Sequence, residues 1–96
     1  MSFRHITLVR FRPELTEAER LAYAAAVIAL HRDKGREVAA APNVGSGPNH
    51  YDFAATVDFP DEAAFRAYIA SPEHKAYVEN FGKPMVDQLA VIQQII

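Results

Sequence analysis

The sequence predicts an α+β protein with the element order β-α-β-β-α-β and one four-stranded antiparallel sheet. Along its 96 residues, hydrophobic periodicity switches between about two, the repeat of a strand, and about 3.6, the repeat of a helix, in that order. Half of the residues are apolar and 23% are charged, as is typical of a protein with a packed core. We therefore expect residues 1–96 to form a single domain.

The chain begins with a strand followed by a helix. Residues 3–11 alternate as a strand, and the side chains directed to one side are Phe3, His5, Thr7, Val9 and Phe11. Pro13 ends this strand. Thr16 and Glu19 then have the spacing of a capping box, which begins an alanine-rich helix that we expect to run to about Lys34.

Two strands are predicted in the middle of the chain. Glu37–Gly47 is the weaker of them, because Pro42 and two glycines interrupt it, and this composition favours an edge strand with a bend or a bulge. The loop of residues 45–49 (GSGPN) then turns the chain. Tyr51–Phe59 alternates cleanly between apolar and polar side chains and is the clearest strand in the sequence.

The last part of the chain is predicted to contain a helix, a helix restart and a strand. Asp61 can cap the helix that carries Phe65 and Tyr68, and Leu89–Ile96 closes the chain as a strand. The complete order of elements is that of the ferredoxin-like fold. This fold leaves one face of the sheet without helices, and the first and last strands carry apolar residues on both sides. We therefore expect a second copy of the chain to cover that face in a homodimer.

The segment Tyr68–His74 (YIASPEH) carries the strongest functional signal. Proline suits the first position of a new helix, and the hydroxyl of Ser71 can cap the amide of His74. His74 and the residues at i+3, i+4 and i+7 are all aromatic or apolar, so the imidazole is predicted to face inward, where Tyr68 can reach it. The pair is either a proton-transfer site or part of a packed core with satisfied hydrogen bonds, and the pattern alone leaves both interpretations open.

These segments together resemble the stress-responsive dimeric α/β-barrel (Dabb) family. The resemblance rests on the first strand HITLVRF, the turn VGSGPN, the strand YDF and the Tyr-x-x-x-Pro-x-His spacing of residues 68–74. It implies a ferredoxin-like monomer whose sheet packs against that of its mate in a dimeric α+β barrel, with a pocket between sheet and helices. A polyketide cyclase of this family closes a ring without a cofactor, so the resemblance implies catalytic roles for Tyr68 and His74 and places His5 in the same pocket.

The chain departs from the family pattern at two places. Ser71 stands where the family usually has a second histidine before the proline. Gln93 or Gln94 stands where an acidic residue is often found in the last strand. Both departures remove groups that could extend a chain of proton transfers.

Two classes of function follow. The first is a homodimeric stress-responsive protein that binds a small apolar or aromatic molecule in the pocket, which we expect His5, Tyr51, Phe53 and Phe81 to line. The second is a cofactor-independent acid/base enzyme. In that enzyme His74 would remove a proton next to a carbonyl while Tyr68 donates a hydrogen bond to the developing enolate.

Composition argues against several other classes. A net charge of −2 with ten scattered basic residues gives no surface for binding nucleic acid. The chain has no cysteine, and neither a signal peptide nor a spanning segment is apparent, so we expect a cytoplasmic protein without a membrane partner. His50 and Asp52 lack a third ligand, so no metal or other cofactor is predicted. His31 near the end of the first helix is expected at the surface.

Overall fold

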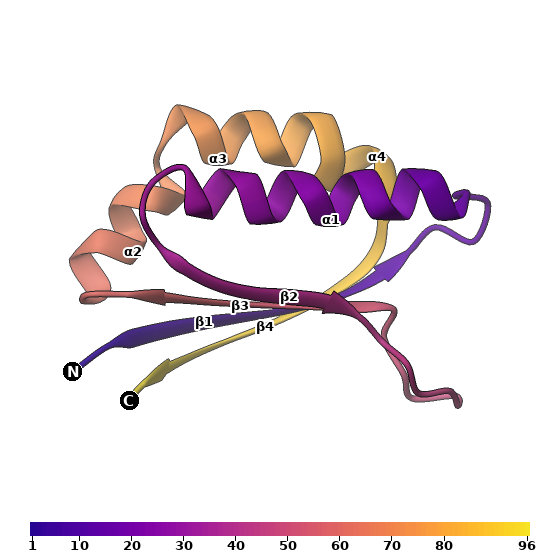
Figure 1. Ribbon diagram of the computed structural model, residues 1–96, viewed down its shortest axis with the longest axis horizontal. Helices are drawn as coiled ribbons and strands as arrows, with labels where there is room; N and C mark the ends of the chain where they lie inside the picture. The colour runs from indigo at the N-terminus through magenta and orange to yellow at the C-terminus, as the bar shows by residue number, and fades with distance from the viewer.

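The structure is a computed structural model that describes residues 1–96, and it has the predicted order of strands and helices (Figure 1). Short turns of π-helix and α-helix extend the restarted helix up to the last strand. The elements are β1 (Phe3–Phe11), α1 (Glu17–Arg32), β2 (Glu37–Pro42), β3 (Phe53–Phe59), α2 (Glu62–Ile69), α3 (Pro72–Tyr77), η1 (Val78–Gly82), α4 (Lys83–Met85) and β4 (Val86–Ile95). None of the helices has the length and hydrophobicity that crossing a bilayer requires.

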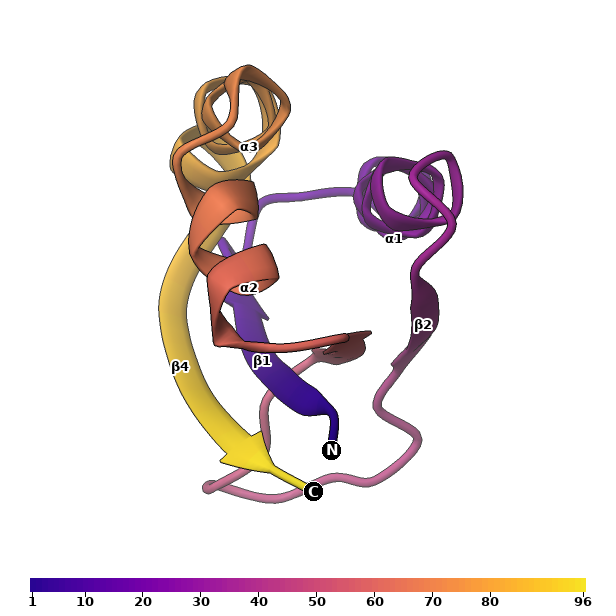
Figure 2. The same ribbon diagram turned by 90° about the vertical axis from the view of Figure 1, so that its left-hand side faces the viewer.

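The sheet has the strand order β2-β3-β1-β4, and each neighbouring pair is antiparallel. The helices cover one face of this sheet, which curves around them (Figure 2). The chain is therefore α+β and ferredoxin-like, as predicted. β1 is central and its pairing places His5 opposite Val57 on one side and Gln93 on the other.

The boundaries of three strands differ from the prediction. β2 ends at Pro42 rather than Gly47, and β3 begins at Phe53 rather than Tyr51. β4 begins at Val86, three residues before the predicted start. β2 is an edge strand, but its pairing with β3 is regular, and the only register shift lies between β1 and β4 at Arg10 and Phe11. The expected bulge in β2 is therefore absent.

The core consists of two clusters of buried side chains between the sheet and the helices. The first lies toward the start of α1, and its members are Val9, Phe11, Tyr23, Val27, Phe53 and Ala55. The second lies beneath α2, and its members are Phe3, Val57, Phe59, Phe65 and Tyr68. On β1 the two clusters are separated by His5 and Thr7, which are half-buried. The most polar stretch of the helix-facing side of β1 thus lies between two apolar regions.

The face of the sheet without helices has an apolar centre and a polar margin. Ile6 and Leu8 on β1 lie at its centre, and Ile92 on β4 pairs with Ile6. At one end of β1, Arg4 donates two hydrogen bonds to Asp58, at 2.8 and 3.0 Å. At the other end, Arg10 contacts the side chain of Gln88 and donates to the carbonyl of His50 at 3.0 Å. An apolar centre with a polar margin is the composition of a protein interface.

All three predicted helix starts are confirmed. At α2, the Asp61 carboxylate accepts a hydrogen bond from the amide of Ala64 at 2.8 Å. Thr16 and Glu19 form a reciprocal capping box at α1, with distances of 2.8 and 3.1 Å. At α3, Ser71 accepts a hydrogen bond from the amide of His74 at 3.2 Å. The Ser71 hydroxyl also donates to the carbonyl of Tyr68 at 2.6 Å, so one side chain joins the end of α2 to the start of α3. This joint fixes the spacing between the rings of Tyr68 and His74.

Replacing Ser71 with alanine is expected to lower the free energy of unfolding by about 1 kcal/mol, because the N-cap of α3 is lost. Ser46→Ala is the matched control, since Ser46 is exposed in a loop, and it is expected to change stability by less than about 0.5 kcal/mol. Urea midpoints of both variants measure the difference. Equal midpoints would show that the cap contributes nothing.

Candidate functional site

A cavity of about 550 Å³ lies between the sheet and the helices, where the two core clusters meet. Its floor follows the register of β1. At one end lie His5 and Gln93, in the middle lies Thr7, and at the other end Val9 pairs with Leu89. The floor therefore changes from polar to apolar along the strand. Of the 22 lining residues, 14 are hydrophobic, which makes the cavity suitable for a largely apolar molecule.

His5 is held in the floor by two hydrogen bonds. The Gln93 amide donates to Nδ1 at 3.0 Å, so Nε2 carries the proton and donates to the Thr7 hydroxyl at 3.1 Å. Burial lowers the pKa of His5, and the nearby His74 lowers it further. His5 is therefore a neutral ring at pH 7, and both of its nitrogens have partners within the chain.

Tyr68 and His74 lie against each other at the polar end of the cavity, and both line it. Their ring centroids are 4.9 Å apart, with the rings at 75°. Burial lowers the pKa of His74, and the nearby backbone of Ile69 partly opposes this effect. A neutral imidazole carries its proton on one ring nitrogen and keeps the other nitrogen free to accept a proton. His74 is thus chemically able to act as a base.

The Tyr68 side chain lines the cavity. Its hydroxyl has no hydrogen-bond partner in the chain, and no buried polar side-chain atom is left unpaired, so this oxygen is accessible. Burial raises the pKa of Tyr68, so the hydroxyl keeps its proton at neutral pH. It can therefore donate a hydrogen bond to a bound molecule.

The prediction that His31 lies at the surface is wrong. The side chain is 3% exposed, and its ring packs against Tyr68 with centroids 4.9 Å apart. Its position at the end of α1 faces the sheet because it continues the stripe formed by Tyr23 and Val27. Burial and the guanidinium of Arg36 lower the pKa of His31 to about 4.

Two of the predicted cavity residues lie elsewhere. Tyr51 precedes β3, where the chain bends, and its ring lies beneath the guanidinium of Arg10 at 4.7 Å. Phe81 lies in η1, whose wider π-helical turn shifts the expected i+7 position away from the cavity. Phe81 packs instead toward Tyr23, with centroids 6.5 Å apart. His5 and Phe53 both line the cavity.

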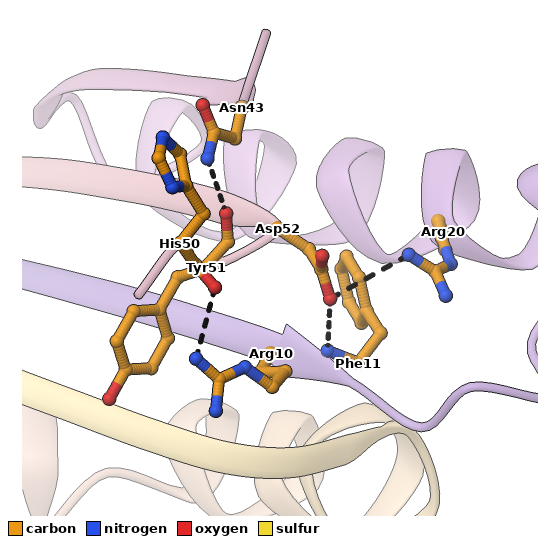
Figure 3. Close-up of polar contacts among 7 residues, drawn as sticks. All are labelled: Arg10, Phe11, Arg20, Asn43, His50, Tyr51 and Asp52. Carbon is orange, nitrogen blue, oxygen red and sulfur yellow. Dashed lines mark hydrogen bonds and ion pairs between the residues drawn. The ribbon is translucent and has the colours of Figure 1, made fainter. Parts of the chain in front are cut away.

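The pair of His50 and Asp52 does not form a metal site. The Asp52 carboxylate accepts a hydrogen bond from the Phe11 amide at 2.9 Å and lies 3.7 Å from Arg20 (Figure 3). The His50 ring points away from this carboxylate. It lies instead against the backbone of Gly45, where a Cβ atom would be only 2.8 Å from His50 Nε2. No group of three or more histidine, aspartate or glutamate side chains in the structure is arranged to hold a metal ion.

The structure adds residues that the sequence pattern did not single out. The hydroxyls of Tyr23 and Tyr77 are hydrogen-bonded to each other at the cavity wall. Arg36 lies behind Tyr68, with its guanidinium carbon 4.8 Å from the ring centroid. Tyr23 lies on the buried stripe of α1 together with Val27. Nothing in the sequence around Arg36 signalled its contact with Tyr68, which depends on the path of the chain after Gly35.

Comparison with known proteins gives a consistent family and fold. The sequence model described as Stress responsive A/B Barrel Domain (Dabb) matches residues 3–95. Among solved structures, the chain is similar to a dimeric ferredoxin-like protein of unknown function from Thermobifida fusca, with 28% identity over 100% of this chain and 92% of that one and a TM-score of 0.85. No curated protein matches the sequence.

Two further structures share the fold. A Dabb family protein from Mesorhizobium loti is 21% identical over 99% of this chain and 96% of that one, with a TM-score of 0.82. A hydroxynitrile lyase from Passiflora edulis is 20% identical over 99% of this chain and 93% of that one, with a TM-score of 0.86. The same architecture therefore occurs both in an enzyme and in proteins without an assigned activity.

The burial of His31 predicts a pH-dependent stability. Its pKa is about 4 in the folded chain and about 6.5 when unfolded, so the unfolded state binds more protons between these values. Stability contributed by the neutral ring is complete above about pH 6.5 and falls by roughly 3 kcal/mol as the pH drops to about 4.

The measurement is the difference in urea midpoint between pH 7.5 and pH 4.5. His31→Leu is expected to reduce this difference, whereas His50→Gln, a change at an exposed histidine, is expected to leave it unchanged. An undiminished pH difference in His31→Leu would contradict the prediction.

Proposed function

The chain belongs to the Dabb family of stress-responsive A/B barrel domains, and on that premise we propose that it is a homodimer whose cavity binds a small, largely apolar or aromatic molecule. The observation that carries this proposal is the cavity of about 550 Å³, with its largely apolar lining and its polar end at His5 and Gln93. A volume of this size suits a molecule with one or two rings. The polar part of the ligand would lie against Tyr68 and His74, and its apolar part would lie over Val9 and Leu89.

The dimer is supported by the helix-free face of the sheet. Its centre at Ile6, Leu8 and Ile92 is apolar, while Arg4 and Arg10 make paired contacts at the margin. Apolar surface of this kind is stabilised when a second sheet packs against it. The Thermobifida fusca relative with the same fold is dimeric.

A second candidate function is cofactor-independent proton transfer. The specific observation is that His74 keeps one ring nitrogen free, next to the unpaired hydroxyl of Tyr68, on an open cavity. In this reaction His74 would take a proton from the carbon next to a carbonyl, and Tyr68 would donate a hydrogen bond to the enolate oxygen. The polyketide cyclase chemistry implied by the family resemblance is a reaction of this class.

Sedimentation equilibrium at micromolar concentration is expected to give twice the chain mass of 10.7 kDa. Leu8→Lys should give the mass of one chain, because it introduces a charge at the centre of the helix-free face. Leu21→Lys is the matched control, since Leu21 is 58% exposed on α1, and it should remain dimeric. A stable monomer of the unchanged protein would contradict the dimer.

Proton transfer can be tested without knowing the natural substrate. We expect the protein to accelerate the exchange of the α-protons of phenylacetone for deuterium, followed by NMR. His74→Gln should lower the exchange rate constant by about a hundredfold because the base is removed, while the cavity and fold remain. His50→Gln should have no effect. Binding of phenylacetone without any acceleration would support the binding function and exclude this chemistry at His74.

A further inference from the structure

We propose that the cavity selects ligands with a negatively charged head group, a carboxylate or a phenolate, on a compact apolar body. This inference rests on the proposed binding function and specifies the class of ligand. Three features of the cavity support it: the absence of acidic side chains from its lining, the position of Arg66, and the contact of Arg36 with Tyr68.

The lining of the cavity contains no aspartate or glutamate, although the chain has 12 acidic residues. Its charged lining residues are Arg66 and Lys83, and the other polar groups are mainly tyrosines and histidines. Glu62 and Glu79, the carboxylates that pair with these two cations, both lie outside the lining, so a cation bound within the cavity would lose its hydration without a carboxylate beside it. An anion, in contrast, would meet hydroxyl and guanidinium donors.

Of the two charged lining residues, Arg66 is the one beside the polar end of the cavity. It follows Phe65, whose ring lies 4.9 Å from that of His5, and both Arg66 and Tyr68 line the cavity. Its partner Glu62 lies 2.9 Å away, but Glu62 is outside the lining and both side chains are more than half exposed. Exposed pairs of this kind are weak, so the guanidinium can turn to a carboxylate of the ligand at small cost.

Arg36 is not part of the lining, but it contacts Tyr68 at the same end of the cavity. Its guanidinium carbon lies 4.8 Å from the Tyr68 ring centroid and 5.1 Å from that of Phe59, and it has no carboxylate partner in the structure. A cation over the ring draws electron density from the phenol, which strengthens its hydroxyl as a donor. The free hydroxyl of Tyr68 is therefore suited to a charged acceptor.

The test uses three probes of the same shape and different charge: 4-butylbenzoate, 4-butylbenzamide and 4-butylbenzylamine. Isothermal titration at pH 7.5 is expected to show benzoate binding about tenfold more tightly than the amide, because a charge-assisted hydrogen bond is about twice as strong as a neutral one. The amine is expected to bind most weakly. Tyr68→Phe should reduce the affinity for benzoate more than that for the amide.

Charge variants separate local recognition from the overall charge of the protein. Arg66→Gln should lower benzoate affinity about tenfold and leave amide affinity unchanged. Lys83→Gln, at the apolar end, should have a smaller effect, and Lys75→Gln, outside the cavity lining, should have none. Equal affinity for the three probes, or tightest binding of the amine, would overturn the inference while leaving the binding function in place. Failure of all three probes to bind would overturn both.

Discussion

The fold and the site both depend on the polar break in β1 between two apolar clusters. Strand alternation places His5 and Thr7 on the side that faces the helices, where Val9 and Phe11 are buried. Buried polar groups must be paired, and the chain pairs them with each other and with Gln93 on β4. Because this row is occupied by hydrogen-bonded side chains rather than by closely packed apolar ones, the two clusters do not merge. The cavity is the space that remains between them.

The apolar surroundings of the cavity decide the ionisation of its rings. Burial lowers the pKa of His5, His31 and His74 and raises that of Tyr68 and Tyr77. Each shift favours the uncharged form, so at neutral pH the rings facing the cavity act as hydrogen-bonding groups rather than as ions. Such a set can bind a polar group without a competing charge, and it can also exchange a proton with it. The proposed binding and the proposed proton transfer would therefore use the same arrangement of side chains.

The sequence was sufficient to predict the features that depend on local patterns. The alternation of residues predicted which side chains of β1 and β3 share a face, and the capping residues Thr16, Asp61 and Ser71 marked three helix starts correctly. The features it did not predict depend on contacts between distant segments or on irregular backbone. Phe81 lies outside the cavity because it is contained in a π-helical turn, which is not signalled by any spacing rule. Tyr51 lies outside the cavity because the chain bends before β3. The place of His31 near a helix end predicted that it would be exposed. It is buried because it lies on the same stripe of α1 as Tyr23 and Val27.

The alternation of β1 also connects the cavity to the proposed dimer interface. His5 and Thr7 form the cavity floor, while Ile6 and Leu8, between and beside them, point to the opposite face. Because consecutive side chains of a strand share one backbone, packing a second sheet on Ile6 and Leu8 would restrict the same peptide units that position His5. His5 in turn is hydrogen-bonded to both Gln93 and Thr7, so both of its ring nitrogens are satisfied. Dimerisation through this face would therefore stabilise the geometry of the cavity floor.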